Sequence, residues 1–376
     1  MYFWGLPQSS GNIGADATNP NPSGTAVADV RAGSEYSIII LEDGTAQSAG
    51  VVNSMENYMG HLGVRGGDVE VGNNPFQNIE FIYDAESDLI VDDTPVFVKA
   101  FAGADSVLSQ GKMHSLLVDN SGRAWTTGSN DKGQLCLGDF RQRNIPQQIP
   151  INGKIIDAAI GSQHSLLLLD DGSVYGCGSN EVGQLGLGID ITTSANAIQI
   201  EGLGVVNRLS AGHSFSLFQS MDSLYATGSN FYGQLCSTTP EENVMTPISI
   251  VDVDVSAVSS FEAIKTSSFI LFSDGSVGVC GRNNVGQLGD GSNEDKVRGL
   301  MQGEGMDDVT ALGVGPSANS VFLIKDNGEI YATGLNDKGQ LGVGDNENKN
   351  LPTLVGFGED ARVTQISASG DHTLAR

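Results

Sequence analysis

The stretch Gly178-Ser179-Asn180-Glu181-Val182-Gly183-Gln184-Leu185-Gly186 decides the fold, because it recurs along the whole chain. Four further stretches repeat its spacing of glycine, asparagine and Gly-Gln-Leu, and two degenerate copies end at Gly14 and Gly63. Repetition at a fixed period indicates units that cover one another's apolar faces. The four further stretches begin at Gly128, Gly228, Gly281 and Gly334.

A hairpin pattern precedes each motif. In the repeat before Gly178, residues 166–169 are a continuous run of four leucines, Asp171-Gly172 follows, and residues 174–177 lead into the motif. Such an apolar run is typical of a strand buried on both faces. Asp-Gly supplies the positive φ angles of a tight turn. Each repeat is therefore predicted to be a hairpin, then a polar loop, then a longer variable segment.

The two ends of the sequence complement each other. The last hairpin begins at Gly370 and stops at Arg376, half a hairpin short, while residues 2–5 read like the second half of one. We therefore expect the N-terminal strand to complete the last blade, because a closed ring leaves no free sheet edge. The prediction is an all-β, closed seven-bladed β-propeller that forms a single domain over residues 1–376.

One repeat is longer than the others. Successive motif glycines lie 50 or 53 residues apart from Gly128 onward, but Gly50 and Gly128 lie 78 apart. We assign the surplus to residues 64–99, predicted to be an acidic insertion that projects from one blade. Long departures from a repeat length are more often functional than structural. The predicted partner-binding residues are Glu80, Phe81, Tyr83, Asp84, Glu86, Asp88, Asp92 and Asp93.

The composition excludes several classes of function. The formal net charge is −26, which disfavours binding to nucleic acid. No apolar run reaches membrane-spanning length, so we expect no membrane contact. The first residues lack a basic leader with an apolar run, and no basic cluster suggests nuclear import. We expect a soluble protein whose compartment the sequence leaves open.

Four cysteines are too few for a disulfide framework. Cys177 and Cys280 stand just before the motif glycine of their repeats. Cys136 and Cys236 replace the glycine found at Gly186. Equivalent positions of successive repeats lie about one blade apart, beyond the reach of a disulfide. The sequence therefore predicts reduced, packed thiols.

Three histidines, His114, His164 and His372, share one repeat position and raise the question of a catalytic or metal-binding group. Tyr36 and Phe215 fill the same position in other repeats. A position that accepts histidine, tyrosine and phenylalanine is a packing position whose polar edge finds a backbone partner. We therefore interpret these histidines as structural.

The motif glutamines invite the idea of a ligand-binding ring. We expect instead that each amide caps the backbone of its own sharp loop, where the flanking glycines take conformations closed to other residues. These glutamines are Gln134, Gln184, Gln234, Gln287 and Gln340.

Two acid-rich loops, residues 290–295 and 345–348, resemble calcium loops faintly. Neither has the spacing and distal glutamate of an EF-hand, and both fall where the repeat needs a polar turn. The chain also lacks a phosphate-binding loop and a nucleophile elbow. The sequence predicts no metal, no cofactor and no enzymatic activity.

The motif Gly-x-Asn-x-x-Gly-Gln-Leu-Gly, coupled to Gly-x-x-His-Ser/Thr-Leu and an Asp-Gly turn, resembles the repeat family of the regulator of chromosome condensation. The resemblance covers essentially the whole chain and implies a seven-bladed propeller with four strands per blade. The family's founding member is an exchange factor for the Ran GTPase that also binds chromatin. The present chain lacks a basic tail, and its insertion lies in a different blade from that member's β-wedge.

We therefore predict a non-enzymatic protein-binding scaffold. Its expected contact surface for a basic protein partner is the insertion at residues 64–99 together with the variable loops that follow each Gln-Leu motif. Two alternatives stay open. One is a guanine-nucleotide exchange factor for a Ran-type small GTPase, which would accelerate nucleotide release. The other is a structural component of a large assembly such as a viral particle, which would show fixed stoichiometry in that particle.

Overall fold

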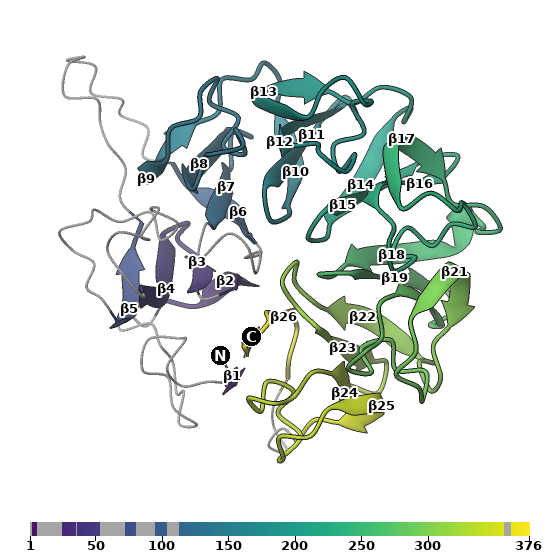
Figure 1. Ribbon diagram of the computed structural model, residues 1–376. Helices are drawn as coiled ribbons and strands as arrows, with labels where there is room; N and C mark the ends of the chain where they lie inside the picture. The colour runs from purple at the N-terminus through teal and green to yellow at the C-terminus, as the bar shows by residue number, and fades with distance from the viewer. Residues whose placement is uncertain are drawn as a thin grey trace.

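The computed structural model describes residues 2–5, 25–34, 36–52, 72–79, 95–103, 113–356 and 362–376. The protein is an all-β propeller, in which antiparallel sheets follow one another around a central channel (Figure 1). Within the described residues, the one helical segment is the 3-10 turn η2 (Val255–Ala257).

Six sheets have four strands each, hydrogen-bonded in the order in which they occur along the chain. The first strand of each sheet lies nearest the channel and the fourth lies at the rim (Figure 1). The strands of the first three sheets are β2 (Val27–Ala32), β3 (Tyr36–Leu41), β4 (Ala46–Val52), β5 (Gly72–Asn78); β6 (Phe97–Ala102), β7 (His114–Asp119), β8 (Ala124–Gly128), β9 (Arg143–Gln148); and β10 (Ile155–Ile160), β11 (His164–Leu169), β12 (Val174–Ser179), β13 (Thr193–Gln199). The strands of the next three are β14 (Val206–Ala211), β15 (Phe215–Ser220), β16 (Leu224–Ser229), β17 (Asn243–Ser249); β18 (Val258–Ala263), β19 (Ser267–Phe272), β20 (Val277–Gly281), β21 (Lys296–Gln302); and β22 (Val309–Gly313), β23 (Ser320–Lys325), β24 (Ile330–Gly334), β25 (Lys349–Leu354).

The remaining sheet joins the two ends of the chain, in the order β1 (Tyr2–Gly5), β27 (His372–Ala375), β26 (Ile366–Ala368). β1 pairs antiparallel with β27 along its whole length, which confirms the predicted pairing of the N-terminal strand with the last hairpin. This sheet has three strands, and residues 6–24, which follow β1, lie outside the described residues. The propeller thus has six complete blades, and the expected closed ring of seven four-stranded blades is not confirmed.

The second strand of each sheet forms where the sequence predicted a strand buried on both faces. Every residue of β11 is buried, as the run of four leucines requires. Its hairpin partner β12 is held in register from His164↔Gly178 to Leu168↔Val174. Gly172 turns the hairpin with φ of 81°, a conformation that glycine adopts at little cost.

The hydrophobic core is divided among the interfaces between neighbouring sheets. Leu116 of β7 and Leu167 of β11, for example, belong to one cluster that joins two blades. The three-stranded sheet is packed on both sides: Leu374 lies in a cluster with β2 and β3, and Ile366 lies in a cluster with β23 and β24. Burying one such aliphatic side chain stabilises the fold by roughly 1.5–3 kcal/mol, so adjacent blades hold one another.

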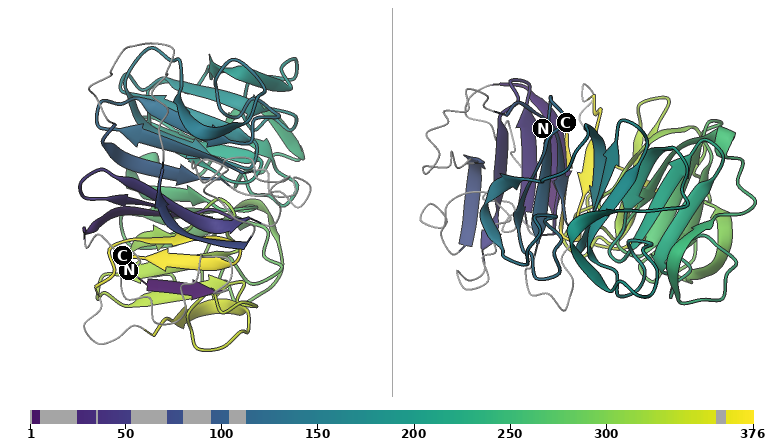
Figure 2. Two further views of the ribbon diagram at one scale, coloured as in Figure 1. Left: turned by 90° about the vertical axis from the view of Figure 1, so that its left-hand side faces the viewer. Right: turned by 90° about the horizontal axis from the view of Figure 1, so that it is seen from above.

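One end of the ring carries the turns between the second and third strands, and we call it the hairpin face. Each first strand begins beside the hairpin turn of the preceding sheet, as in the bonds from Phe97 N to Gly44 O at 3.0 Å and from Val206 N to Gly172 O at 3.0 Å. The turns therefore all lie at the same end of the ring, which Figure 2 shows edge-on. The hairpin turns are residues 42–45, 120–123, 170–173, 221–223, 273–276 and 326–329.

The opposite end, the loop face, carries the Gly-Gln-Leu motifs. Each motif loop rests on the next blade, so closely that a Cβ on Gly183 would lie 2.6 Å from Met245 Cα. Gly183 has φ of 87°, and the close approach requires glycine there as well. The motif loops are residues 129–142, 180–192, 230–242, 282–295 and 335–348.

The boundaries predicted for the insertion are wrong in part. β5 lies within residues 64–99 and pairs with β4, so it is the fourth strand of a blade. β6 also begins inside that interval, at Phe97. The surplus residues therefore fall in three connections of the chain, residues 53–71, 79–96 and 103–113. The last of these separates β6 from β7 and lies outside the predicted interval; the next two blades have three residues there, 161–163 and 212–214.

The prediction of reduced thiols is also wrong. Disulfides join Cys136 to Cys177 and Cys236 to Cys280, each with Cα atoms 5.4 Å apart. The expected separation of one blade applies to equivalent positions of successive repeats. The bonded positions are not equivalent. The motif loop reaches over the third strand of the next blade, so the ninth residue of the motif (Cys136 or Cys236) meets the fourth residue of that strand (Cys177 or Cys280).

Candidate functional site

The channel holds a cavity of about 390 Å³. First strands from around the ring line it, together with loops such as residues 314–316 and 364–365. Most lining residues are small and apolar, and a few are polar or charged. Volumes of a few hundred Å³ with sparse polar groups are characteristic of small-molecule pockets.

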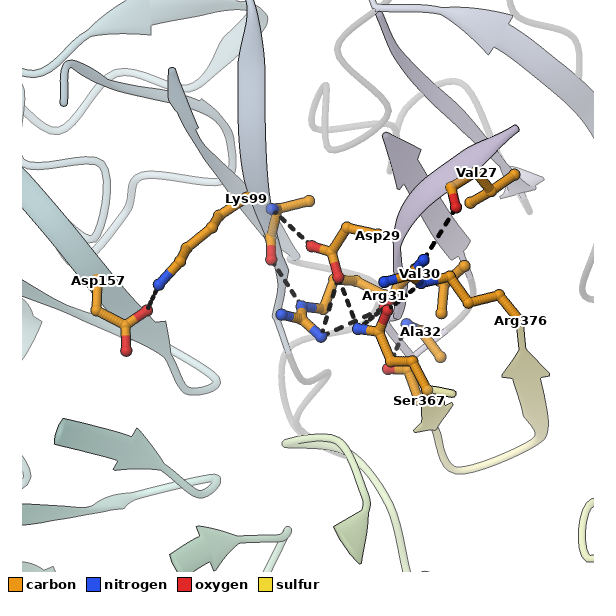
Figure 3. A network of polar contacts seen from close by, with 11 residues as sticks. Val27, Asp29, Val30, Arg31, Ala32, Lys99, Asp157, Ser367 and Arg376 are labelled. Atoms are coloured by element: carbon orange, nitrogen blue, oxygen red, sulfur yellow. Dashed lines mark hydrogen bonds and ion pairs between the residues drawn. The ribbon is translucent and has the colours of Figure 1, made fainter. Parts of the chain in front are cut away.

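Asp29 organises one side of the channel wall (Figure 3). Its carboxylate accepts hydrogen bonds from Ala100 N at 3.2 Å and from Gln365 Nε2 at 2.6 Å, and it pairs with Arg31 at 3.4 Å. Arg31 Nε in turn donates to Ala100 O at 2.8 Å. These contacts connect β2 to β6 on one side and to the segment before β26 on the other.

The end of the chain extends the same network. Arg376 Nε donates to Gln365 Oε1 at 2.7 Å, and its Nη1 donates to Val27 O at 3.1 Å. Ala32 N donates to Ser367 Oγ at 2.9 Å (Figure 3). Polar contacts therefore join the three-stranded sheet to β2 in addition to the apolar cluster behind them.

The third residues of four successive first strands alternate in charge. They are Asp29, Lys99, Asp157 and Arg208, which hold equivalent register positions opposite the second strands. Lys99 Nζ contacts Asp157 Oδ1 at 2.9 Å and donates to Ile156 O at 3.0 Å. Each charge thus has an opposite charge on the neighbouring strand, which lowers the cost of placing them at the channel.

Glu262 is the poorly compensated charge of the channel. The described residues form no ion pair with it, and among them its side-chain carboxylate accepts a hydrogen bond only from Ser210 Oγ, at 3.4 Å. Burial away from water raises the pKa of the carboxyl to about 7, against the attraction of Arg31. Because the side chain borders the cavity, a cationic group placed there would compensate it.

The repeated histidines are packing residues, as predicted. His114, His164 and His372 are each at most 1% exposed. Burial lowers the pKa of His114 to about 4 and of His164 to about 3, so both are neutral near pH 7. The expected backbone partner is correct for Tyr36, whose hydroxyl donates to His114 O at 2.7 Å.

The ring nitrogens of the histidines contact the next blade through a hydroxyl instead. His114 Nε2 lies 2.9 Å from Ser165 Oγ, and His164 Nε2 lies 3.1 Å from Ser216 Oγ. Ser165 Oγ donates its proton to Gln134 O at 2.7 Å, so His114 Nε2 must be the donor to Ser165. The neutral tautomer is thereby fixed, and the contact joins blades without a nucleophile or a metal.

The motif glutamines cap their own loops, which confirms that prediction. Gln184 Oε1 accepts a hydrogen bond from Val182 N at 3.1 Å, and the other four glutamines repeat this contact. The motif asparagine adds a second cap, since Asn180 Oδ1 accepts from Leu185 N at 2.9 Å. These side chains are committed to the backbone and do not form a ligand ring.

The two acid-rich loops form ion pairs with lysine side chains. Lys296 Nζ lies 2.8 Å from Asp290 Oδ2, and Lys349 Nζ lies 2.7 Å from Asp345 Oδ2. Over the part of the chain that the structure describes, three or more metal-ligating side chains do not gather anywhere.

The two faces of the ring differ in how their charges are paired. On the loop face, ion pairs join motif-loop acids to cations, as in Arg143–Asp139 at 2.7 Å and Lys132–Glu181 at 2.6 Å. On the hairpin face, no described residue forms an ion pair with an acid of the turns. The exposed acids of the turns are Glu42, Asp43, Asp170, Asp171, Asp222, Asp274, Asp326 and Glu329.

Three acids of the hairpin turns, Asp43, Asp171 and Asp274, have a lowered pKa and are ionised at neutral pH. A hydrogen bond from Thr45 N lowers the pKa of Asp43, and hydrogen bonds from the hydroxyl and the backbone of Ser173 lower the pKa of Asp171. Ser276 does the same for Asp274. The hairpin face therefore carries a persistent negative charge.

Exposed apolar side chains accompany these acids. Val98 is 50% exposed and Ile156 is 40% exposed, at equivalent positions in neighbouring first strands. Val96 packs against the turn glycine Gly44, and Val205, which is 62% exposed, packs against Gly172. Apolar and acidic groups thus alternate over several neighbouring blades.

The partner-binding residues that we predicted lie outside the described residues, in residues 80–94. They are Glu80, Phe81, Tyr83, Asp84, Glu86, Asp88, Asp92 and Asp93. The flanking residues are described: Ile79 N donates to Ala46 O at 2.9 Å, beside the turn at Gly44. Both flanks of residues 80–94, Ile79 and Val96, therefore lie at the hairpin face.

Sequence reasoning missed the channel residues Arg31 and Glu262. We located only the hairpin of each repeat and treated the first strand as part of a variable segment. The signal was the period-2 alternation of β2 and β18, in which polar residues face the channel and apolar residues face the core. In the described residues, no helix is long and apolar enough to cross a membrane.

The fold and its surfaces define a repeat propeller of the kind that presents rigid faces for protein interaction. The family model of the RCC1-like domain matches residues 1–375, and the chain belongs to that family. Relatives include the ultraviolet-B receptor UVR8 of Arabidopsis thaliana, 29% identical over 74% of this chain, and the human probable E3 ubiquitin-protein ligase HERC6, 29% identical over 100% of it. The chain spans 63% of the first protein and 30% of the second.

Solved structures agree on the fold. Human WBSCR16 superposes with a TM-score of 0.80 at 20% identity, covering 100% of this chain and 99% of that one. Prp20p of Saccharomyces cerevisiae, described with its binding to Gsp1p and histones, gives a TM-score of 0.77 at 17% identity, covering 100% of this chain and 90% of that one. At these identities the likeness establishes the propeller alone.

Proposed function

We propose that the protein is a non-enzymatic protein-binding scaffold that uses its hairpin face to hold a basic partner. The observation that carries the proposal is the asymmetry between the faces: turn acids without ion pairs lie beside exposed Val98, Ile156 and Val205. Unpaired acids attract a basic partner over a distance, and apolar contact then holds it. Relatives described as binding proteins, such as Prp20p, support a protein partner.

The acidic segment of residues 80–94 belongs to the same proposal. Its described flanks lie at the hairpin face, next to the turn at Gly44. Its sequence is rich in acids and contains the aromatic residues Phe81 and Tyr83. Aromatic side chains rimmed by charge are enriched at protein interfaces, so we assign the segment to partner binding.

Paired surface variants test the proposal. The native protein is used to capture its partner from the source cells, with identification by mass spectrometry. Val98→Asp with Ile156→Asp, on the hairpin face, is expected to abolish capture. The matched control is Phe140→Asp with Ile189→Asp, at exposed positions of the loop face, which is expected to capture normally. Loss of capture by the loop-face pair alone would overturn the assignment.

A deletion tests the acidic segment separately. Replacing residues 81–94 by a short Gly-Ser linker keeps β5 and β6 intact and is expected to leave the melting temperature unchanged. Capture is expected to fall and to lose much of its dependence on salt, because the remaining contact is more apolar. Full, equally salt-sensitive capture would remove the segment from the proposal.

The identity of the captured partner distinguishes the alternative functions. Recovery of a small GTPase favours the exchange-factor alternative and leads to a nucleotide-release assay. Recovery of a particle of fixed stoichiometry favours a structural role in a large assembly. A basic protein that affects neither nucleotide release nor assembly is the result expected from the scaffold.

We also propose that the three-stranded sheet serves as the seventh blade. Three features support this: the β1–β27 pairing, the apolar clusters on both sides of the sheet, and the polar network through Gln365 and Ser367. In this interpretation the N-terminal strand holds the ring closed.

A further inference from the structure

The channel contains one layer with a single cation and a single carboxyl group. Arg31 and Glu262 pair with the third residues of β3 and β19, Ile38 and Phe269, so they lie at the same depth. The other first strands place uncharged residues at this depth. These residues are Phe101, Ala159, Ser210, Gly313 and Ser367.

Arg31 and Glu262 both have hydrogen-bonding capacity that the described residues do not satisfy. Arg31 donates through Nε to Ala100 O and through Nη1 to Val30 O, and no described residue accepts a hydrogen bond from Nη2. Glu262 has one long contact, with Ser210 Oγ at 3.4 Å. Arg31 exerts the strongest attraction on Glu262 among the surrounding cations, yet the two side chains form no ion pair. Both side chains line the same cavity.

The surroundings limit what can fill that space. The cavity measures about 390 Å³ and borders both Arg31 and Glu262. Asp157 and Lys99 already neutralise each other, as do Asp29 and Arg31 in part. A ligand with a net charge would therefore meet a nearly balanced wall. A ligand that carries both charges would satisfy Nη2 of Arg31 and the carboxylate of Glu262 at once.

We propose that the channel binds a free α-amino acid with a small or aliphatic side chain. Its carboxylate accepts hydrogen bonds from Arg31, and its ammonium group donates to Glu262 and Ser210. Its side chain rests on the small apolar residues of the wall, such as Ala159 and Leu209. Burial of Glu262 supports the assignment, because the ammonium group restores the charged state that burial disfavours. This site is separate from the hairpin face.

Calorimetric titration of the full chain near pH 7.5 tests the proposal. Glycine, L-alanine and L-valine are the probes, and at least one is expected to bind saturably with one site per chain. Valinamide lacks the carboxylate and 3-methylbutanoate lacks the ammonium group, so each is expected to bind at least about tenfold more weakly than L-valine, since each loses a charge-assisted hydrogen bond. Failure of all three amino acids, or equal binding of a one-charge analogue, overturns the proposal.

A matched pair of variants locates the ligand. Glu262→Gln keeps the side-chain shape and is expected to weaken L-valine at least about tenfold while leaving the weak binding of 3-methylbutanoate unchanged. Glu201→Gln, an exposed glutamate outside the channel, is expected to leave both affinities unchanged. A melting curve of each variant establishes that it is folded. Unaltered L-valine affinity in Glu262→Gln would place the ligand elsewhere and overturn the assignment.

Discussion

At the scale of single residues, hydroxyl groups join neighbouring blades. Ser165 both accepts from His114 Nε2 and donates to Gln134 O, and it is fully buried. Ser216 repeats the arrangement with His164 and Gln184. One small side chain therefore satisfies a ring nitrogen and a carbonyl that are otherwise isolated from water.

We expect Ser165→Ala to lower the free energy of unfolding by roughly 2–4 kcal/mol, because it leaves a buried donor and a buried acceptor without partners. Chemical denaturation at pH 7.5 measures the change. Ser273→Ala, at an exposed position of a hairpin turn, is the control and is expected to change stability by less than about 0.5 kcal/mol. Equal effects of the two substitutions would show that the buried contact contributes nothing.

At the scale of structural elements, the joint between a motif loop and the next blade occurs in two chemical forms. Cys136 and Cys236 bond to Cys177 and Cys280. Where the loop has Gly186, the partner position holds Thr227, whose hydroxyl donates to Gly183 O at 2.8 Å. A cysteine in the motif loop thus faces a cysteine in the third strand of the next blade, and a glycine in the loop faces a threonine there.

The pairing suggests a substitution that removes the covalent bond and keeps the packing. Replacing Cys136 by glycine and Cys177 by threonine installs the glycine–threonine form of the joint. The disulfide closes a segment with a sequence separation of 41, so its loss is expected to lower the free energy of unfolding by about 4 kcal/mol in the chain-entropy model. Denaturation under oxidising conditions measures this value.

Reductant supplies the control for that substitution. It is expected to destabilise the unaltered protein more than the Cys136→Gly/Cys177→Thr variant, which retains only the Cys236–Cys280 bond. If reductant affected both proteins equally, the Cys136–Cys177 bond would carry no stability.

The β1 strand makes a second prediction at this scale. Deleting residues 1–5 exposes the edge of β27, which β1 otherwise pairs along its length. We expect a lower melting temperature and self-association, because an exposed sheet edge pairs with other chains. Size-exclusion chromatography and thermal melting measure both effects, and a synthetic peptide of residues 1–6 is expected to reverse them. A monomeric deletion variant with unchanged melting would contradict the proposed closure.

The sequence revealed the elements whose local pattern repeats. The leucine run of β11, the Asp171-Gly172 turn and the capping by Gln184 are encoded within a few residues, and the structure confirms them. The first strands and the disulfides depend on contacts between blades. The Cys136–Cys177 disulfide, for example, joins positions that are not equivalent in the two repeats. Aligning the repeats compares only equivalent positions, so it does not reveal such a contact.

At the scale of the whole molecule, blade packing places titratable groups out of water. Burial lowers the pKa of His114, His213 and His372 to about 4 and that of His164 to about 3. An exposed histidine in the unfolded chain titrates near pH 6.5. Between these pH values the unfolded chain therefore binds more protons than the folded protein does. The free energy of unfolding falls as the pH decreases from about 6.5 toward 4.

Glu262 acts in the opposite direction. Its folded pKa of about 7 lies above the ordinary value of 4.5, so its contribution to stability falls as the pH rises between these values. The groups that face it are Arg31, Asp157 and Arg208. Each pKa unit of difference between the folded and unfolded states corresponds to about 1.4 kcal/mol of stability. The four histidines together therefore contribute more than the one glutamate. We expect acid to destabilise the protein.

Thermal melting from pH 8 to pH 4 is expected to show a melting temperature that falls steeply below about pH 6.5. His164→Phe provides the matched test, because Phe215 fills the equivalent position of the next blade and Ser216 keeps its bond to Gln184 O. The variant retains the packing and loses one proton-binding site of the unfolded state, so its stability should decline less steeply with acid. An unchanged slope would mean that His164 is charged in the folded protein, or that its blade is already open before the molecule unfolds.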